Sequence, residues 1–379
     1  MLLERERERL REHWRRRRPP VDAATHAAAA VGWLHRAQDA NGDGGVSHSY
    51  LLGKGWMRSY PETTGYIIPT LLNWSASTGD ADSRRRALDM ARWELQVQQQ
   101  SGAIPNLTDG QPVVFDTGQV LFGWLSAHGA TGEASFLHAA RRGGDWLLAV
   151  LDADGVWRHS ADAGGPGRTY NVCVAWALLA LTEASGEPRY GDAVRRFLAW
   201  TLEQEREHGW FERNCLNDDT APLLHTIAYT ARGQLECGVR LGDAALVAAA
   251  SRTAAALAAQ VDARGRLAGR FARGWRPAAR WACLTGMAQM SIVWRRLQEL
   301  QAVSDKEAAT GVAAARRVND FLCRTQDRSA ANGGLRGGIR GSYPIQGDYG
   351  RYRVLNWATK YFIDALLYEL PQRHVPFPY

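Results

Sequence analysis

Two acidic residues stand where helices are expected to begin, and both are of a type that performs acid–base chemistry. Glu62 lies in the stretch PETTGYIIPT and Asp116 in the stretch FDTGQV, and a long apolar segment follows each of them. Cleavage of a glycosidic bond with inversion requires a carboxylic acid that protonates the leaving oxygen and a carboxylate that activates water, ~6.5–9.5 Å apart. We therefore take Glu62 and Asp116 as candidate catalytic residues for hydrolysis.

The elements that must position these carboxylates form a repeat. Six segments begin with a polar residue and continue as an apolar helix, and their anchor residues are 54, 55, 54, 60 and 71 positions apart: Glu62, Asp116, Asn171, His225, Thr285 and Asn356. A period of this length is typical of an array of helical hairpins. The sequence therefore predicts one structural unit that is repeated six times.

Six further amphipathic segments lie between these starts, so twelve helices are expected. The segments with a polar face span residues 24–38, 82–99, 133–150, 187–206, 243–260 and 305–324. Helices that are apolar all round are buried on every side. We therefore predict that the six apolar helices form an inner ring and that the six helices with a polar face form an outer ring. Glycine-containing turns end the outer helices, which places all six following loops at one end. No alternating strand pattern is found, and the fold class predicted is all-α, an (α/α)6 barrel or toroid.

The chain is divided accordingly into three parts. Residues 1–22 form a basic N-terminal arm, residues 23–372 the toroid and residues 373–379 a C-terminal tail. Residues 1–20 supply +4 of the formal net charge of +7, so the overall basicity is weak evidence for a nucleic-acid partner, and none is expected. A solvated helical arm is the simpler interpretation, with contact of its four consecutive Arg to acidic lipid or nucleic acid as the alternative.

The hairpin pattern, the glycine turns and the stretch DTGQV resemble the six-hairpin glycosidase superfamily and related toroids, which include polysaccharide lyases and terpenoid cyclases. The stretches PETTGYIIPT and LLHTIAYT also resemble uncharacterised toroid proteins of bacterial exopolysaccharide clusters. The resemblance covers roughly residues 24–370. It implies the toroid fold and a carbohydrate-active enzyme of the kind that places carboxylates on successive inner helices, and one toroid can host several reactions.

The first turns of the inner helices should converge at the end that carries the loops. We expect that Tyr66, Gln119, Arg168, Tyr170, Asn171, Arg273, Trp281, Gln289, Asn356, Trp357 and Lys360 bind substrate there. Each polar residue of this kind has a simpler interpretation as a helix cap or a first-turn residue. Six helix starts that each bring polar residues to one place favour a substrate-binding site.

A different reaction remains open. His225 and Tyr229 are four residues apart and share a helix face, and we include both among the candidate catalytic residues. Their resemblance to toroidal lyases implies that Asn171 neutralises a uronate carboxylate, that His225 or Tyr229 removes the C5 proton and that a Tyr returns a proton to the leaving oxygen. A uronate C5-epimerase would use related proton chemistry. The alternative is that His225 caps its helix and Tyr229 packs in the interior.

The charge of two loop segments indicates the partner. Residues 262–280 carry six Arg against one Asp, and residues 324–353 carry six Arg against two Asp. Arginine binds carboxylates bidentately, so an acidic oligosaccharide or polysaccharide is the expected substrate. With 43 Arg and three Lys, however, the chain uses Arg for nearly every surface cation.

Two further function classes stay open, and several features are not expected. In the first, the toroid is a non-catalytic component of polysaccharide assembly that binds glycan without turnover. In the second, it is a terpenoid cyclase with an aromatic interior. No metal or cofactor motif is found, since the EF-hand-like stretch that begins at Asp39 has Tyr50 where Glu is required. No apolar segment is long enough to cross a membrane, no secretory signal is recognised, and five unpaired cysteines favour the cytoplasm.

Overall fold

The computed structural model describes residues 5, 6, 8, 22–159, 165–377 and 379. Most of the predicted N-terminal arm therefore lies outside the described residues. The chain divides into two compact units. Unit 1 comprises Met1–Ser59, Leu223–Ala228 and Ala254–Arg373, and unit 2 comprises Tyr60–Pro222, Tyr229–Thr253 and His374–Tyr379. Within the described ranges, every helix is too short or too polar to cross a bilayer.

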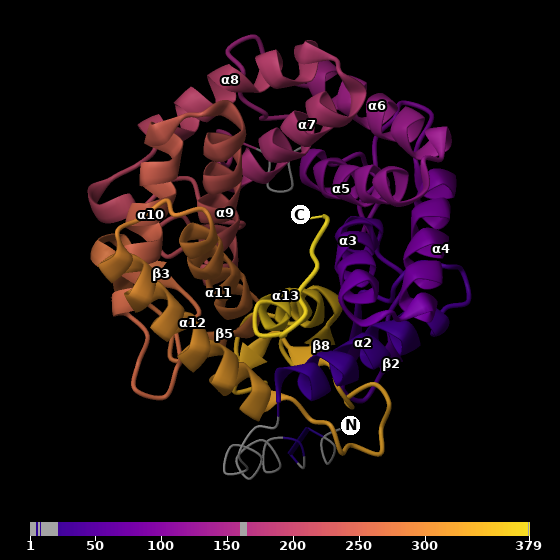
Figure 1. Cartoon of the computed structure of the whole chain (residues 1–379), viewed down its shortest axis with the longest axis vertical. Coiled ribbons are helices and arrows are strands. Elements are labelled where there is room, and N and C mark those ends of the chain that lie inside the picture. The colour runs from indigo at the N-terminus through magenta and orange to yellow at the C-terminus, as the bar shows by residue number, and fades with distance from the viewer. Residues whose placement is uncertain (1–4, 7, 9–21, 160–164, 378) are drawn as a thin grey trace. The chain divides into compact units, whose positions relative to one another are not determined.

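The described part of the chain forms twelve α-helices, which Figure 1 colours in chain order. They are α2 (Ala23–Asp39), α3 (Pro61–Thr78), α4 (Ala81–Val97), α5 (Val114–Thr131), α6 (Ala134–Ala149), α7 (Val172–Ser185), α8 (Pro188–Glu203), α9 (Leu224–Leu241), α10 (Ala244–Ala259), α11 (Leu284–Glu299), α12 (Asp305–Thr325) and α13 (Asn356–Leu367). The predicted outer helices agree with α2, α4, α6, α8, α10 and α12 to within three residues at each end.

The two predicted kinds of helix differ in burial as their sequences indicate. In α7 every residue from Val172 to Leu181 is buried, whereas the buried residues of α4 follow the spacing of a single helix face. In unit 2, α3 packs against α5, which packs against α7, and each of these helices also packs against the helix that follows it. In unit 1, α11 packs against α12 and α13, and α13 packs against α2.

Close approach of neighbouring helices in unit 2 depends on glycine. A Cβ atom on Gly65 of α3 would lie 2.6 Å from the Cα atom of Val120 in α5, and a Cβ on Gly118 of α5 would lie 2.9 Å from a methyl group of Val174 in α7. Each glycine directly follows a threonine. Gly65 lies within one helical turn after Glu62, and Gly118 lies within one helical turn after Asp116. The Thr-Gly pairs therefore bring the helix starts that carry the candidate carboxylates against their neighbours.

Unit 1 contains short strands that the sequence analysis did not predict. A four-stranded antiparallel sheet has the order β2-β1-β8-β6, and Ser49 of β1 (Ser49–Leu51) pairs with Leu355 of β8 (Arg353–Leu355). Its other strands are β2 (Gly55–Trp56) and β6 (Ile339–Arg340). Two smaller sheets pair β3 (Phe271–Ala272) with β4 (Arg276–Pro277) and β5 (Ala282–Cys283) with β7 (Ser342–Tyr343). Strands of two or three residues are too short to show an alternating pattern.

The C-terminal tail is held by α3 in unit 2. The side chain of Asn73 donates to the carbonyl of Phe377 at 2.7 Å and accepts from its N–H at 3.1 Å. One turn later, Ser77 forms the same two bonds with the backbone of His374, at 2.9 and 3.0 Å. The ring of Tyr379 stacks on Phe122 of α5, with centroids 5.0 Å apart. Figure 1 shows the tail running beside α3.

We expect that Asn73→Ala lowers the free energy of unfolding by about 1–3 kcal/mol, because two hydrogen bonds are lost at a buried position. Asn73→Asp is the matched control, since an aspartate still accepts from the N–H of Phe377 but no longer donates to its carbonyl. Urea unfolding followed by circular dichroism measures both variants. A variant N73A as stable as the parent would show that these bonds contribute nothing.

Candidate functional site

Four of the inner helices begin without a side-chain cap, whereas α11 has one, in which Cys283 accepts from the N–H of Gly286. Neither α3, α5, α7 nor α13 has a side-chain cap hydrogen bond from its N-cap residue. Three outer helices have side-chain caps, since Asp22 caps α2, Asp80 caps α4 and Ser304 forms a capping box on α12, and the outer helices α6 and α8 have none. At the starts of α3, α5, α7 and α13 the polar side chains are therefore not engaged as N-caps, and they remain available to a ligand.

Asp116 is the buried carboxylate of this region. It lies in the first turn of α5 and is 1% exposed. The hydroxyl of Tyr60, the N-cap residue of α3, donates to its Oδ2 atom at 3.3 Å. Glu62 lies two residues after Tyr60 in the first turn of α3 and is partly exposed. The starts of two neighbouring helices thus supply one buried carboxylate and one that is open to solvent.

Aromatic rings join the starts of three helices in unit 2. The ring of Phe115 lies 5.5 Å from that of Tyr170 and 5.0 Å from that of Tyr229, in edge-to-face geometry at both contacts. Tyr66 of α3 is also buried. Phe115 was not among the predicted site residues, although its position directly before Asp116 was a usable signal. Apolar ring faces of this kind suit the faces of sugar rings.

Two amides beside this cluster contain buried atoms without a protein partner in the described structure. Both Oδ1 and Nδ2 of Asn171 are buried and make no hydrogen bond, and the same holds for Nε2 of Gln119. Asn171 ends the 3₁₀ turn η1 (Thr169–Asn171) that leads into α7. Buried polar atoms without partners are rare in native structures, and a ligand is one explanation for them.

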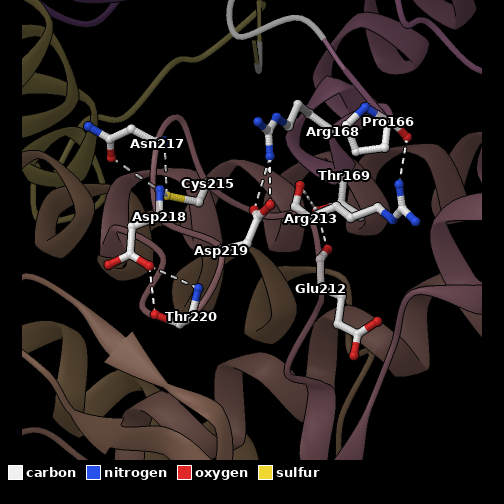
Figure 2. Close-up of polar contacts among 10 residues, drawn as sticks. All are labelled: Pro166, Arg168, Thr169, Glu212, Arg213, Cys215, Asn217, Asp218, Asp219 and Thr220. Atoms are coloured by element: carbon white, nitrogen blue, oxygen red, sulfur yellow. Dashed lines mark hydrogen bonds and ion pairs between the residues drawn. The ribbon is translucent and has the colours of Figure 1, made fainter.

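Arg168 precedes η1 and faces an acidic residue of a distant loop. Figure 2 shows its guanidinium pointing toward Asp219, to whose two carboxylate oxygens Nη1 donates at 3.0 and 2.9 Å. The side chain of Arg168 is 10% exposed and that of Asp219 is 48% exposed. The sequence predicts substrate binding for Arg168 but gives no indication of this pairing.

A second cluster lies in unit 1 and is centred on His225. Its Nδ1 atom is 2.8 Å from Oε1 of Gln289, so Nδ1 carries the proton, and its ring is 5.4 Å from that of Tyr349. Trp357 donates through Nε1 to the hydroxyl of Tyr349 at 2.7 Å. Burial lowers the pKa of His225 from 6.5 to about 4, against the opposing effect of the hydrogen bond that Nδ1 donates to Gln289. Three predicted residues therefore lie together here, with Tyr349 as an addition.

The remaining predicted residues of unit 1 are held in different ways. Lys360 is buried, pairs with Asp364 at 2.7 Å and lies 4.2 Å from the ring of Tyr361. Asn356 donates to the carbonyl of Ser47 at 3.1 Å. Trp281 is partly exposed and packs on Gly269, and Arg273 is exposed.

The arginine-rich segment 262–280 in unit 1 presents several cations to solvent. Arg266 pairs with Asp262 at 3.0 Å and Arg270 approaches Asp348 at 4.0 Å. The exposed members are Arg264, Arg273, Arg276 and Arg280. Across the ranges that the structure describes, no three His, Cys, Asp or Glu side chains are grouped so as to hold a metal ion.

Comparison with known proteins identifies the fold. No protein-family model and no curated protein sequence matches the chain. An unsaturated glucuronyl hydrolase from Bacillus sp. GL1, described as responsible for the degradation of glycosaminoglycan, has 18% identity and a TM-score of 0.75 over 94% of this chain and 99% of its own. An unsaturated glucuronyl hydrolase specific for heparin has 18% identity and a TM-score of 0.72 over 91% and 96%.

A third similar structure is a cellobiose 2-epimerase from Bacillus thermoamylovorans, with 10% identity and a TM-score of 0.70 over 89% of this chain and 95% of its own. All three are (α/α)6 toroids of the glycosidase-like kind. The present chain has this fold, and the predicted fold class is confirmed.

Proposed function

We propose that this protein is a glycoside hydrolase that cleaves a glycosidic bond next to a uronate residue, with Glu62 and Asp116 as its paired carboxylates. The observation that carries the proposal is the buried Asp116 at the start of α5, hydrogen-bonded by Tyr60 from the start of α3. A carboxylate in that position costs free energy for folding, and catalysis is the role that accounts for it.

In the proposed reaction one of the two carboxyl groups protonates the oxygen of the leaving sugar while the other removes a proton from the attacking water. Tyr60 orients Asp116 through its hydroxyl. The ring faces of Phe115, Tyr170 and Tyr229 stack against the sugar and limit access of bulk water. Gln119 and Asn171 bind sugar hydroxyls through their buried amides.

The acidic character of the substrate has two supports. Two of the similar structures are glucuronyl hydrolases by name, and the present chain exposes the arginines of segment 262–280. Exposed cationic side chains attract anionic substrates and raise their local concentration.

Elimination and epimerisation would instead need a base that removes a carbon-bound proton, and His225 is the histidine that sequence analysis singled out for it. A general base works best when its pKa lies near the operating pH. Since burial lowers the pKa of His225 to about 4, this imidazole is a weak base at neutral pH. Its environment therefore supports a binding role and favours hydrolysis.

A product assay tests the proposal. Purified protein is incubated with uronate-containing oligosaccharides, both saturated and 4,5-unsaturated at the non-reducing end, and reducing ends and near-ultraviolet absorbance are followed together. Hydrolysis creates reducing ends without a new absorbance band. A new band would show elimination, and a changed sugar configuration without new reducing ends would show epimerisation, and either result would overturn the proposal.

A further inference from the structure

The guanidinium of Arg168 is incompletely satisfied by its acidic partner. Only Nη1 donates to Asp219, and it serves both carboxylate oxygens. The Nε atom is buried and has no hydrogen-bond partner in the described structure. The strong arrangement for an arginine and a carboxylate uses two parallel N–H groups, so Asp219 leaves the better edge of this guanidinium unused.

The loop that carries Asp219 is organised by its own contacts, which Figure 2 shows. The N–H groups of Asn217 and Asp218 donate to Sγ of Cys215 at 3.3 and 2.9 Å. Thr220 donates to Oδ1 of Asp218 through its N–H at 3.0 Å and its hydroxyl at 2.6 Å. The loop therefore keeps its shape without the ion pair between Asp219 and Arg168.

The base of this loop is fixed to the segment that carries Arg168. The N–H of Thr169 donates to the carbonyl of Arg213 at 3.1 Å. Arg213 in turn donates through Nη1 to the carbonyl of Pro166 at 2.9 Å. Because these contacts hold the base while Asp219 itself is half-exposed, the carboxylate can leave Arg168 without unfolding the loop.

One turn further along the chain stands Asn171, whose side-chain oxygen and nitrogen are both buried without partners. The same turn thus presents a buried cation with an unused N–H group and an amide with an unused donor and acceptor. A uronate sugar carries a carboxylate beside ring hydroxyls, which is the set of groups that these atoms can bind.

We propose that Arg168 is the binding position for the carboxylate of the substrate, and that Asp219 is a resident carboxylate that occupies this position when no substrate is bound. The substrate displaces Asp219 because it engages two N–H groups of the guanidinium where Asp219 engages one. This inference rests on the proposed function for the class of ligand, but it requires no bond cleavage.

The displacement has a measurable consequence for affinity. For a ligand that must displace a resident group, the Kd is raised by the reciprocal of the fraction of molecules in which the position is free. For an ion pair with a half-exposed partner, the occupied state is favoured by a factor of about 2 to 5. The position is then free in about one third to one sixth of the molecules, and removal of the resident carboxylate should lower the Kd by about 3- to 6-fold.

The test uses D-glucuronate and D-glucose as probes in titrations of the full chain followed by NMR. We expect that Asp219→Asn lowers the Kd for glucuronate about threefold and leaves the Kd for glucose unchanged. Asp218→Asn is the matched control, since it alters the same loop at the carboxylate bound to Thr220, and both dissociation constants should stay at the parent values. Arg168→Gln should abolish the preference for glucuronate.

Three results would overturn the inference: weaker or unchanged glucuronate binding in D219N, an equal change for glucose, or an unchanged preference in R168Q. Thermal unfolding establishes that each variant is folded, and D219N decides the matter if R168Q does not fold. Failure of the proposed function is a separate result. A chain that hydrolyses nothing but prefers glucuronate through Arg168 would refute the hydrolase and retain the carboxylate position.

Discussion

Replacement of Asp116 by Asn should reduce the rate of glycoside hydrolysis by about 10²–10⁴-fold, which is the usual contribution of a positioned acid or base. The amide has nearly the same shape as the carboxylate and still accepts a hydrogen bond from the hydroxyl of Tyr60. The helix start should therefore remain intact. The measurement is the rate of release of reducing ends at saturating and at low substrate concentration, and the loss should appear in kcat.

Glu62→Gln should cause a loss of similar size if the two carboxylates act as a pair. Tyr60→Phe is the matched control, because it removes the hydroxyl that donates to Asp116 and leaves both carboxylates in place. We expect a smaller decrease for Y60F, about 10-fold, because the hydrogen bond from Tyr60 is long and should contribute near the lower end of the range of about 1.5–3 kcal/mol for hydrogen bonds to charged groups. Activity that persists in D116N would remove Asp116 from the mechanism.

Helix positions were accessible from the sequence because the signal for them is local. Apolar residues with helical spacing, and the glycine turns between them, predicted the ends of α4, α6 and α12 to within three residues. The Thr-Gly pairs that contain Gly65 and Gly118 were visible in the sequence as well, but their role in the close packing of neighbouring helices was not. A glycine inside a helix reveals close approach only when the neighbouring helix is placed against it.

The partners of the candidate residues were not accessible, because they depend on side chains far apart in the chain. Arg168 and Asp219 are separated by 51 residues, and His225 and Gln289 by 64. Sequence analysis placed the second pair at helix starts without predicting that they would meet. It assigned Arg168 to the substrate and could not predict that an acidic loop occupies the same guanidinium.

Lys360 shows a further limit. Sequence analysis selected it because lysine is rare in this chain and because it lies near a helix start. Asp364, which pairs with it, stands one turn later and was visible in the sequence. A pair at this spacing is ordinarily a surface contact of small value, and only the structure reveals that Lys360 is buried. Its burial, unlike its position, depends on the packing of α13 against α2 and α11.

Acidification should destabilise the protein between pH 6.5 and about pH 4 through two histidines of unit 1, of which His225 is buried and His48 is partly buried. Burial lowers the pKa of His48 to about 4, with a further decrease from the charge of Arg353, and burial lowers the pKa of His225 to about 4. In the unfolded chain both imidazoles take up a proton near pH 6.5, whereas in the folded chain they do so only near pH 4. The free energy of unfolding is therefore highest above pH 6.5 and decreases as the pH falls through this window.

The size of this effect follows from the two pKa values. One pKa unit corresponds to about 1.4 kcal/mol, so each histidine contributes up to about 3 kcal/mol between neutral pH and pH 4. Glu94 of α4 changes the free energy of unfolding with pH in the opposite direction. Burial raises the pKa of this carboxyl well above its ordinary value, so its contribution favours the folded state at low pH and is lost as the pH rises above about 4.5.

Urea unfolding at pH 7.5, 6.0 and 4.5 separates these contributions. In His48→Gln and His225→Gln the decrease in the free energy of unfolding between the first and last pH should shrink by about 2–3 kcal/mol each, because the titrating group is absent. Glu94→Gln is the control of opposite sign, since it removes a group that favours low pH, and it should make the decrease larger. If both histidine variants kept the full pH dependence of the parent, the acid sensitivity would have to arise from other groups.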